Sequence, residues 1–301
     1  ANRIVVAPMC QYSATDGTAS DWHMMHLGQF AVSGVGLLLT EATGVVPEGR
    51  ISPNCLGLYS DENEAALGRV VNFVREYGNS PIGIQIAHAG RKASTEPPWQ
   101  GQGAVMPEDG GWELVAPSAI PFSNRSEMPR AMTKEDIEHA QEGFVQATKR
   151  ADRLGMDCIE IHAAHGYLAQ SFLSPLSNKR EDEYGGSLEN RMRFLLETFE
   201  KVRAAWPKEK PLGVRITSSD WVDGGWDIGD SVALAIELEK RGCDFIVASS
   251  GGATPDAAVI AGPGYQVGFA AEIKRNMTDM AVMAVGLITD LRHADSIIRS
   301  G

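Results

Sequence analysis

Residues 158–167 carry three side chains that could take part in acid–base chemistry, His162, His165 and Tyr167, within six positions. The first half of this stretch, Cys-Ile-Glu-Ile-His, is apolar enough for a buried β-strand, and a polar turn follows it. Because alternate residues of a strand share a face, Glu160 and His162 point the same way. Such a cluster at the end of a strand can bind an oxygen atom or deliver a proton.

This cluster is compatible with two chemistries. In the first, N–H groups of His162 and His165 bind an oxygen that gains negative charge while Tyr167 gives a proton, which suits reduction of an activated alkene. In the second, the histidines bind the metal of a barrel hydrolase, but a metal needs a third ligand, and Arg215 and Gln85 are poor candidates. The alternative without chemistry is a pair of hydrogen-bonded structural histidines.

The elements that must position these side chains alternate regularly along the chain. Seven short apolar runs predict strands at residues 4–7, 36–41, 81–86, 158–162, 212–216, 245–248 and 281–285. Capping residues and apolar periodicity predict helices between them, at about residues 21–33, 61–77, 133–154, 187–206, 231–241, 268–276 and 290–300.

Strands that are apolar on both faces and alternate with helices indicate a parallel sheet. A doubly wound sheet would need a glycine-rich phosphate turn after an early strand, and the sequence has none. We therefore predict a single α/β domain over residues 1–301, a (β/α)8 TIM barrel truncated before its eighth strand and incomplete at both ends. The Pro-, Gly- and Trp-rich segment 87–132 is long enough to be a functional loop.

Composition excludes several classes of protein. A formal charge of −12 argues against nucleic acid or an anionic membrane as the main partner. The four cysteines are widely spaced, which fits neither a disulfide framework nor a metal cluster and favours the reducing cytoplasm. No apolar run approaches membrane-spanning length.

In a barrel of this kind the active site lies at the carboxyl ends of the strands. Besides the His–Tyr cluster, the residues at these positions are Cys10, Tyr12, Ala42, Thr43, Gln85, His88, Arg215, Ser249, Ser250 and Gly286. An unpaired Arg215 would suit an anionic or electron-rich ring such as a flavin. An ion pair of Arg215 with Glu160 or Asp220 is an equal alternative.

Three further features each have two interpretations. Cys10 lacks a base in the sequence pattern, so by itself it is better described as a packed small side chain than as a nucleophile. Gly286 could allow the backbone to approach a phosphate, or could be a simple turn glycine. Arg91 and Lys92 are the nearest basic pair for a dinucleotide phosphate, with solvated surface charges as the alternative.

Several runs of residues together resemble the Old Yellow Enzyme family of NADH:flavin oxidoreductases. They are Pro8-Met9-Cys10-Gln11-Tyr12, Glu41-Ala42-Thr43, residues 85–92, the run His162-Ala163-Ala164-His165-Gly166-Tyr167-Leu168, Phe172-Leu173-Ser174-Pro175 and Tyr184-Gly185-Gly186-Ser187. The resemblance covers essentially the whole chain. The combination of Cys10 and Tyr12 resembles the one found in the bacterial branch of the family, which includes xenobiotic reductase and NADPH dehydrogenase.

The resemblance implies an FMN-dependent ene-reductase that takes hydride from NADPH or NADH. Its substrates would be small α,β-unsaturated carbonyl or nitro compounds, reduced by hydride transfer to the β-carbon and protonation of the α-carbon. By the same resemblance, the residues that contact the flavin are Pro8, Met9, Cys10, Ala42, Gln85 and Arg215, and Gly286 belongs to its phosphate site. His162 and His165 would hold the substrate carbonyl, Tyr167 would donate the proton, and Tyr12 would line the substrate side.

The resemblance also implies segments outside this chain. Members of the family have an eighth strand with a phosphate loop and a C-terminal tail that lines the site or reaches a partner subunit. We therefore expect part of a longer, homo-oligomeric protein. The alternative from another functional class is a non-catalytic fragment of a flavoenzyme. Within the family, the dienoyl-CoA reductase branch is a related possibility.

Overall fold

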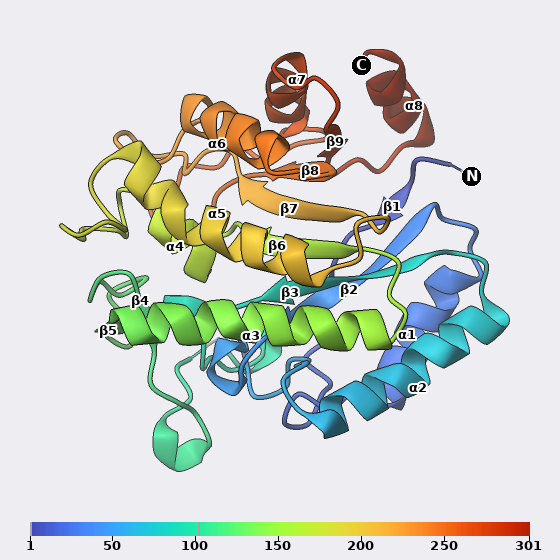
Figure 1. Cartoon of the computed structure of the whole chain (residues 1–301), viewed down its shortest axis with the longest axis horizontal. Helices are drawn as coiled ribbons and strands as arrows, with labels where there is room; N and C mark the ends of the chain where they lie inside the picture. Colours follow the sequence, from blue (N-terminus) through green and yellow to red (C-terminus); the bar gives the residue numbers. More distant parts are fainter. Residues whose placement is uncertain (1, 102) are drawn as a thin grey trace.

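The central element of the fold is one curved sheet of seven parallel strands (Figure 1). The computed structural model describes residues 2–101 and 103–301. The strands, in their order across the sheet, are β1 (Val5–Val6), β2 (Leu37–Gly44), β3 (Ile82–Ala87), β6 (Ile159–Ala163), β7 (Leu212–Thr217), β8 (Phe245–Ser249) and β9 (Ala281–Ala284). Within the described residues β1 and β9 are not paired with each other, so the sheet is open there.

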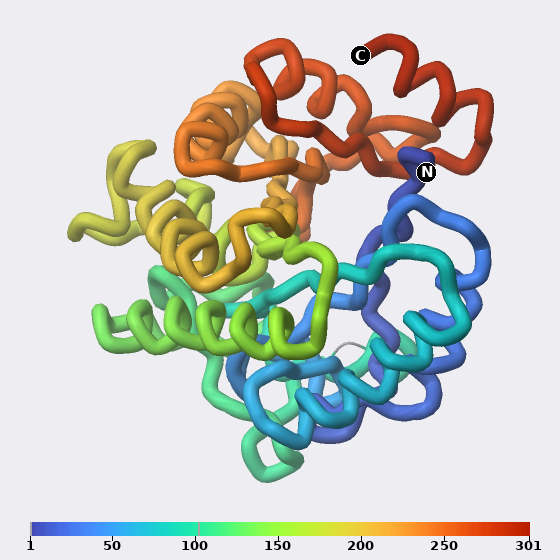
Figure 2. The backbone as a smooth tube through the Cα atoms, turned by 45° about the vertical axis from the view of Figure 1, so that its right-hand side comes forward, coloured from blue at the N-terminus to red at the C-terminus, as the bar shows by residue number. Residues whose placement is uncertain are grey.

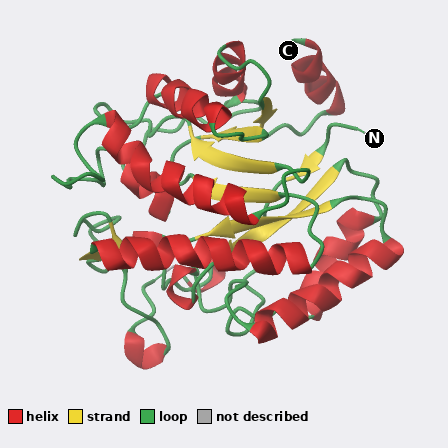
Figure 3. Cartoon of the chain, viewed as in Figure 1, coloured by secondary structure: helices red, strands yellow, loops and turns green. Residues whose placement is uncertain are grey.

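Helices cover the outer face of the sheet, as Figures 1 and 3 show. They are α1 (Asp21–Ala31), α2 (Asp61–Tyr77), α3 (Lys134–Arg153), α4 (Leu168–Leu173), α5 (Leu188–Ala205), α6 (Ile228–Lys240), α7 (Val267–Arg275) and α8 (Leu291–Arg299). The two chain ends lie on one side of the molecule (Figures 1 and 2), which is the side where Figure 1 labels β1 and β9. The predicted TIM-barrel-like α/β fold is confirmed. No helix in the described part of the chain is long and apolar enough to span a membrane.

Alternation along each strand separates two kinds of core. In β6, Ile159 and Ile161 point outward into the large core between the sheet and the helices. Cys158 points inward and packs with Phe245 in a smaller cluster inside the sheet. Because the period of a strand is two, Glu160 and His162 lie on the same inner side as Cys158, so the functional side chains of β6 face the concave interior.

Local capping chemistry explains where most helices begin. Thr133 and Asp136 form the capping box that the sequence predicted for α3. Ser187 accepts a hydrogen bond from the backbone N–H of Asn190 at the start of α5. Helix α6 begins at Ile228, before the predicted start at residue 231, because Asp227 is its N-cap.

The long segment 87–132 is more ordered than predicted. It contains the 3₁₀ turns η2 (Gly90–Lys92), η3 (Pro98–Gln100) and η4 (Pro107–Asp109), and the paired strands β4 (Val115–Ala116) and β5 (Arg130–Ala131). A further 3₁₀ turn, η1 (Pro47–Gly49), follows β2. The short helix α4, directly after the His–Tyr turn, was also not predicted, because its six residues are too few to show a helical period.

Candidate active site

After β6 the chain makes a tight turn through two residues with a left-handed backbone conformation. His165 has a φ of 60° and Gly166 a φ of 76°. The backbone N–H of His165 donates to the Thr217 hydroxyl at 2.8 Å, which ties the turn to β7. A Cβ added to Gly166 would lie 2.1 Å from the carbonyl oxygen of Gly252, after β8. Only glycine allows this close approach of the two loops.

The turn brings three aromatic rings together. The rings of His162 and His165 have centroids 5.1 Å apart, and those of His162 and Tyr167 have centroids 4.9 Å apart, both edge to face. The Nδ1 atom of His162 accepts a hydrogen bond from the backbone N–H of Ala164 at 3.2 Å. Since a neutral imidazole carries one N–H, the proton of His162 is on Nε2, where it can be donated.

The electrostatics hold all three groups in uncharged forms. Burial, followed by the nearby positive charges of Arg215 and Lys92, lowers the pKa of His165 well below its ordinary value, and the same causes together with His165 lower the pKa of His162. Burial raises the pKa of Tyr167 well above its ordinary value. At neutral pH the cluster therefore offers neutral imidazoles and a protonated phenol, which are hydrogen-bond and proton donors.

Lys92 and Arg91 are structural cations in the wall of the site. The Nζ of Lys92 donates to the carbonyl oxygens of His165 at 2.7 Å and Gly252 at 3.1 Å. The guanidinium of Arg91 donates to three loop carbonyls, those of Ile120, Pro121 and Ala253. The N–H groups of Arg91 and Lys92 thus donate to loop carbonyls. The alternative that these two residues are solvated surface charges is therefore wrong.

Burial, followed by the neighbouring charge of Arg91, lowers the pKa of Lys92 to about 8. The Lys92 ammonium lies 5.2 Å from the centroid of the Tyr167 ring and 4.4 Å from that of Phe122. Lys92 therefore supplies a positive charge next to the Tyr167 phenol. The sequence did not predict this contact, because Lys92 follows β3 and Tyr167 follows β6, which are far apart along the chain.

The inner side of the sheet beneath the cluster is polar. The amide of Gln85 donates to the Glu160 carboxylate at 2.5 Å, and burial raises the pKa of Glu160 while Arg215 opposes that rise. Among the described residues the Glu160 carboxylate accepts from Gln85, and the Asp220 carboxylate accepts from Gln170 and Ser174. The alternative of an ion pair between Arg215 and one of these carboxylates is therefore not found. The Nε of Arg215 is buried and has no hydrogen-bond partner in the described part of the chain.

Ser249, at the end of β8, contacts both the cluster and this arginine. Its hydroxyl lies 2.7 Å from Nε2 of His165 and 3.5 Å from a terminal nitrogen of Arg215. The Gln266 side chain accepts from Ser249 at 3.4 Å and from Ser250 at 2.7 Å. The sequence placed Ser249 at a strand end but gave it no role, because serine has no motif of its own here.

The loop after β1 supplies the opposite wall. Cys10, Tyr12 and Tyr167 pack against one buried cluster that includes Ala42 and Cys55. Burial, then the charge of Glu41, raises the pKa of Cys10 to about 12. This shift is opposite in direction to that of an activated thiol nucleophile, whose pKa is lowered.

The remaining predicted contacts lie around this wall. Pro8 is half-buried and Met9 is exposed. The ring of Tyr12 packs edge to face on Trp99 of η3, with centroids 5.6 Å apart. Gly286, after β9, has a φ of 119°, and an added Cβ would lie 2.8 Å from the Gln266 amide nitrogen. The structure therefore requires glycine at residue 286 for conformation and packing.

A metal ion bound by His162 and His165 would be surrounded by positive charge. Arg215 and Lys92 both act on the two imidazoles. Within residues 2–101 and 103–301 no group of three His, Cys, Asp or Glu side chains is arranged to hold a metal. The positive charges beside the imidazoles favour binding of an electron-rich oxygen over a cation.

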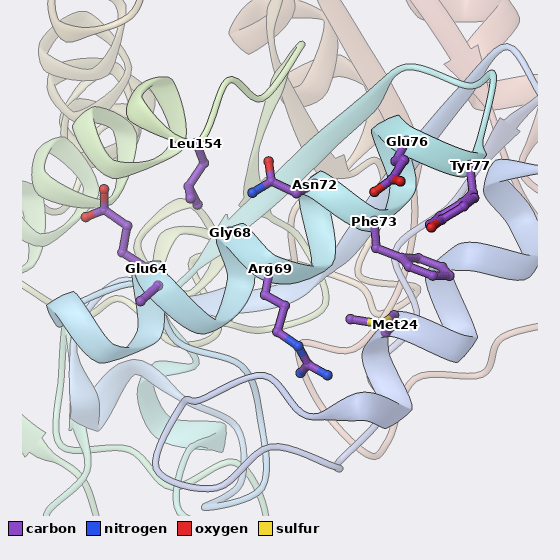
Figure 4. A pocket seen from close by; sticks show the side chains of 10 residues that line it. Met24, Glu64, Gly68, Arg69, Asn72, Phe73, Glu76, Tyr77 and Leu154 are labelled. Carbon is purple, nitrogen blue, oxygen red and sulfur yellow. The ribbon is translucent and has the colours of Figure 1, made fainter.

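A surface hollow of about 690 Å³ lies elsewhere, between α1, α2 and the end of α3 (Figure 4). The figure shows Met24, Phe73, Tyr77 and Leu154 around it, with Arg69 and Glu64 among its polar residues. None of the strand-end residues lines this hollow.

Comparison with known proteins gives consistent matches. The sequence profile described as the NADH:flavin oxidoreductase / NADH oxidase family matches residues 1–301. An NADPH dehydrogenase of Geobacillus sp. (strain WCH70) is 47% identical over 302 residues, which cover 100% of this chain and 83% of that protein.

Solved structures agree with the sequence matches. Morphinone reductase aligns with a TM-score of 0.80 at 27% identity, covering 98% of this chain and 80% of that one. An old yellow enzyme homologue from Zymomonas mobilis aligns with a TM-score of 0.79 at 26% identity, covering 100% of this chain and 82% of that one.

Proposed function

The chain belongs to the NADH:flavin oxidoreductase / NADH oxidase family, which is the Old Yellow Enzyme family, and we propose that it is an FMN-dependent ene-reductase. Membership makes it a flavin oxidoreductase of the NADPH dehydrogenase type. The proposal adds FMN as cofactor, NADPH or NADH as hydride donor, and small α,β-unsaturated carbonyl or nitro compounds as substrates. It treats residues 1–301 as one FMN-binding domain of a homo-oligomer.

The observation that carries the proposal is the neutral pair His162 and His165 beside the protonated phenol of Tyr167. The carbonyl oxygen of an enone gains negative charge when its β-carbon receives hydride. Two imidazole N–H groups stabilise that oxygen most when its charge is greatest, so they lower the barrier more than they tighten substrate binding. Nearby Arg215 and Lys92 add a favourable positive potential.

Tyr167 is proposed as the proton donor to the α-carbon. Its raised pKa keeps the phenol protonated at neutral pH, and its ring packs against the imidazole of His162. A proton donor close to the oxygen-binding pair can reach a neighbouring carbon of the same small substrate. General acids placed in this way contribute roughly 10²–10⁴-fold to a rate.

The strand-end residues fit a flavin ring. Arg215 offers a buried Nε without a partner in the described residues, as expected for a donor that meets an electron-rich ring edge. Gln85 and Ala42 lie on the neighbouring strands β3 and β2, and Pro8, Met9 and Cys10 lie on the loop after β1. When bound, FMN would supply the hydride for the β-carbon. Gly286 remains the proposed phosphate contact.

The absorbance spectrum of the purified protein tests the proposal. A flavin spectrum should bleach on anaerobic addition of NADPH and return on addition of cyclohexenone without oxygen. A protein without bound flavin, or a reduced flavin that only oxygen re-oxidises, would contradict it. Elemental analysis of the same sample separates the flavoenzyme from a metal-dependent hydrolase.

A further inference from the structure

A buried carboxylate lies directly beneath the loop that carries Cys10. The Glu41 carboxylate, at the middle of β2, is 3.1 Å from Nε2 of His23 on α1. Both side chains are almost completely buried, with relative exposures of 1% for His23 and 2% for Glu41. The second oxygen of Glu41 accepts the backbone N–H of Gln11 at 3.2 Å. This N–H belongs to the peptide bond that links Cys10 to Gln11.

The histidine partner of Glu41 is neutral. The backbone N–H of Ser20 donates to Nδ1 of His23 at 2.9 Å, while the Ser20 hydroxyl donates to the carbonyl oxygen of Ser13. An imidazole nitrogen that accepts a hydrogen bond carries no proton, so the single N–H of His23 is on Nε2 and donates to Glu41. The Glu41–His23 pair therefore keeps the negative charge of the carboxylate.

That charge acts on Cys10. Burial raises the pKa of the Cys10 thiol most; among the charged groups, Glu41 raises this pKa further and Arg215 lowers it by a smaller effect. Glu41 also acts on the two other weak acids of this wall, Tyr12 and Cys55. The β2 carboxylate and the β7 guanidinium thus face Cys10 with opposite charges.

We propose that Glu41, held by His23, is a positioning residue that fixes the Cys10–Gln11 peptide next to the flavin and whose charge adds to burial in keeping Cys10 a thiol. The part of the inference that concerns the flavin rests on the proposed function. A thiol can donate a hydrogen bond to the ring, whereas a thiolate would place a second negative charge beside it. The negative charge of the carboxylate would also disfavour added electrons on a bound flavin and so would lower its reduction potential.

Glu41→Gln tests the proposal in the holoenzyme. The amide has the same shape and can still accept one hydrogen bond, but it has no charge. The midpoint potential of the bound flavin should become more positive. Iodoacetamide should alkylate Cys10 at pH 9 about tenfold faster than in the wild type, which corresponds to a decrease of about one unit in the thiol pKa. Mass spectrometry of the Cys10 peptide measures this rate.

Two other variants serve as controls. His23→Gln keeps the carboxylate and supplies an amide donor, so Cys10 alkylation should stay close to the wild-type rate. A tenfold increase in this variant would overturn the proposal even if Glu41→Gln did not fold, because packing and not charge would then protect the thiol. Glu48→Gln removes the carboxylate of the exposed His139–Glu48 pair, whose atoms are 2.9 Å apart, and should change neither measurement.

The two measurements separate this inference from the proposed function. Faster alkylation in Glu41→Gln, in a protein that does not reduce enones, would support the coupling of Glu41 to Cys10 and contradict the proposed function alone. An unchanged alkylation rate and an unchanged flavin potential in a folded Glu41→Gln enzyme would overturn the inference while the ene-reductase proposal stands.

Discussion

The imidazole rings of His162 and His165 stand edge to face, with centroids 5.1 Å apart and ring planes at 85°. This arrangement depends on the left-handed backbone of His165, because an extended chain would carry residues three positions apart away from each other. The ring of Tyr167 stands at 84° to that of His162. One turn of chain therefore presents two hydrogen-bond donors and a proton donor to the same region.

Tyr167→Phe should separate the two half-reactions. Loss of the phenol removes the proton donor, so re-oxidation of the flavin by cyclohexenone should slow by roughly 10²–10⁴-fold. Flavin reduction by NADPH needs no proton from this residue and should be nearly unchanged. Stopped-flow absorbance of each step provides the measurement, and an equal loss in both steps would contradict the proton-donor role.

Ser249→Ala should disturb His165 without removing it. The hydroxyl of Ser249 lies 2.7 Å from Nε2 of His165, and this hydrogen bond orients the ring and influences which of its nitrogens carries the proton. Its loss removes a hydrogen bond worth about 0.5–1.5 kcal/mol. Enone reduction should fall by roughly 2- to 10-fold, and the ring nitrogens of His165 should change their ¹⁵N chemical shifts.

Ser250→Ala is the matched control for Ser249→Ala. The Ser250 hydroxyl donates to Gln266 at 2.7 Å and has no hydrogen bond to His165 among the described residues. Enone reduction in this variant should stay near the wild-type rate. Similar losses in both serine variants would mean that the loop after β8, and not the tautomer of His165, is responsible.

Arg215→Met should weaken FMN binding. Its buried Nε lacks a partner in the described residues, and a hydrogen bond to a charged group contributes about 1.5–3 kcal/mol, so the dissociation constant should rise by roughly 10–100-fold. Fluorescence of released FMN measures this change. Arg69→Met, at an exposed site on α2, should leave the affinity unchanged, and wild-type affinity in Arg215→Met would exclude a flavin contact.

The stability of the protein should depend on pH through His88. Burial lowers the pKa of His88 to about 4, from an ordinary value of 6.5. The unfolded chain therefore binds the proton first as the pH falls, so this residue destabilises the folded state progressively between pH 6.5 and 4. The linked loss is about 2 kcal/mol between pH 6.5 and 5.

Urea unfolding at pH 7 and pH 5 checks this dependence. His88→Gln has no proton to bind, so its free energy of unfolding should fall less on acidification than that of the wild type. His139→Gln, at an exposed position on α3, keeps His88 and its burial and removes only a smaller influence on it, so it should retain most of the wild-type pH dependence. Identical pH dependence in His88→Gln and the wild type would refute the assignment.

The sequence predicted the parallel sheet correctly, because local information specifies it. Each strand is a short run of apolar residues, and each long helix shows an apolar period and a capping residue, as at Ser187 and Thr133. Strand ends followed from the same pattern. Helix α4 and the strands β4 and β5 were missed because they are too short to show a period.

The sequence by itself therefore determined which side chains lie at the carboxyl ends of the strands. Their chemical state depended on tertiary structure. Burial together with Arg215 and Lys92, from β7 and the loop after β3, keeps His162 and His165 neutral. Likewise, Glu41 and His23 meet only because α1 packs against β2. Charges and hydrogen bonds act through space, so residues distant in the chain set the protonation of the site. A local pattern of residue types does not reveal which distant residues these are.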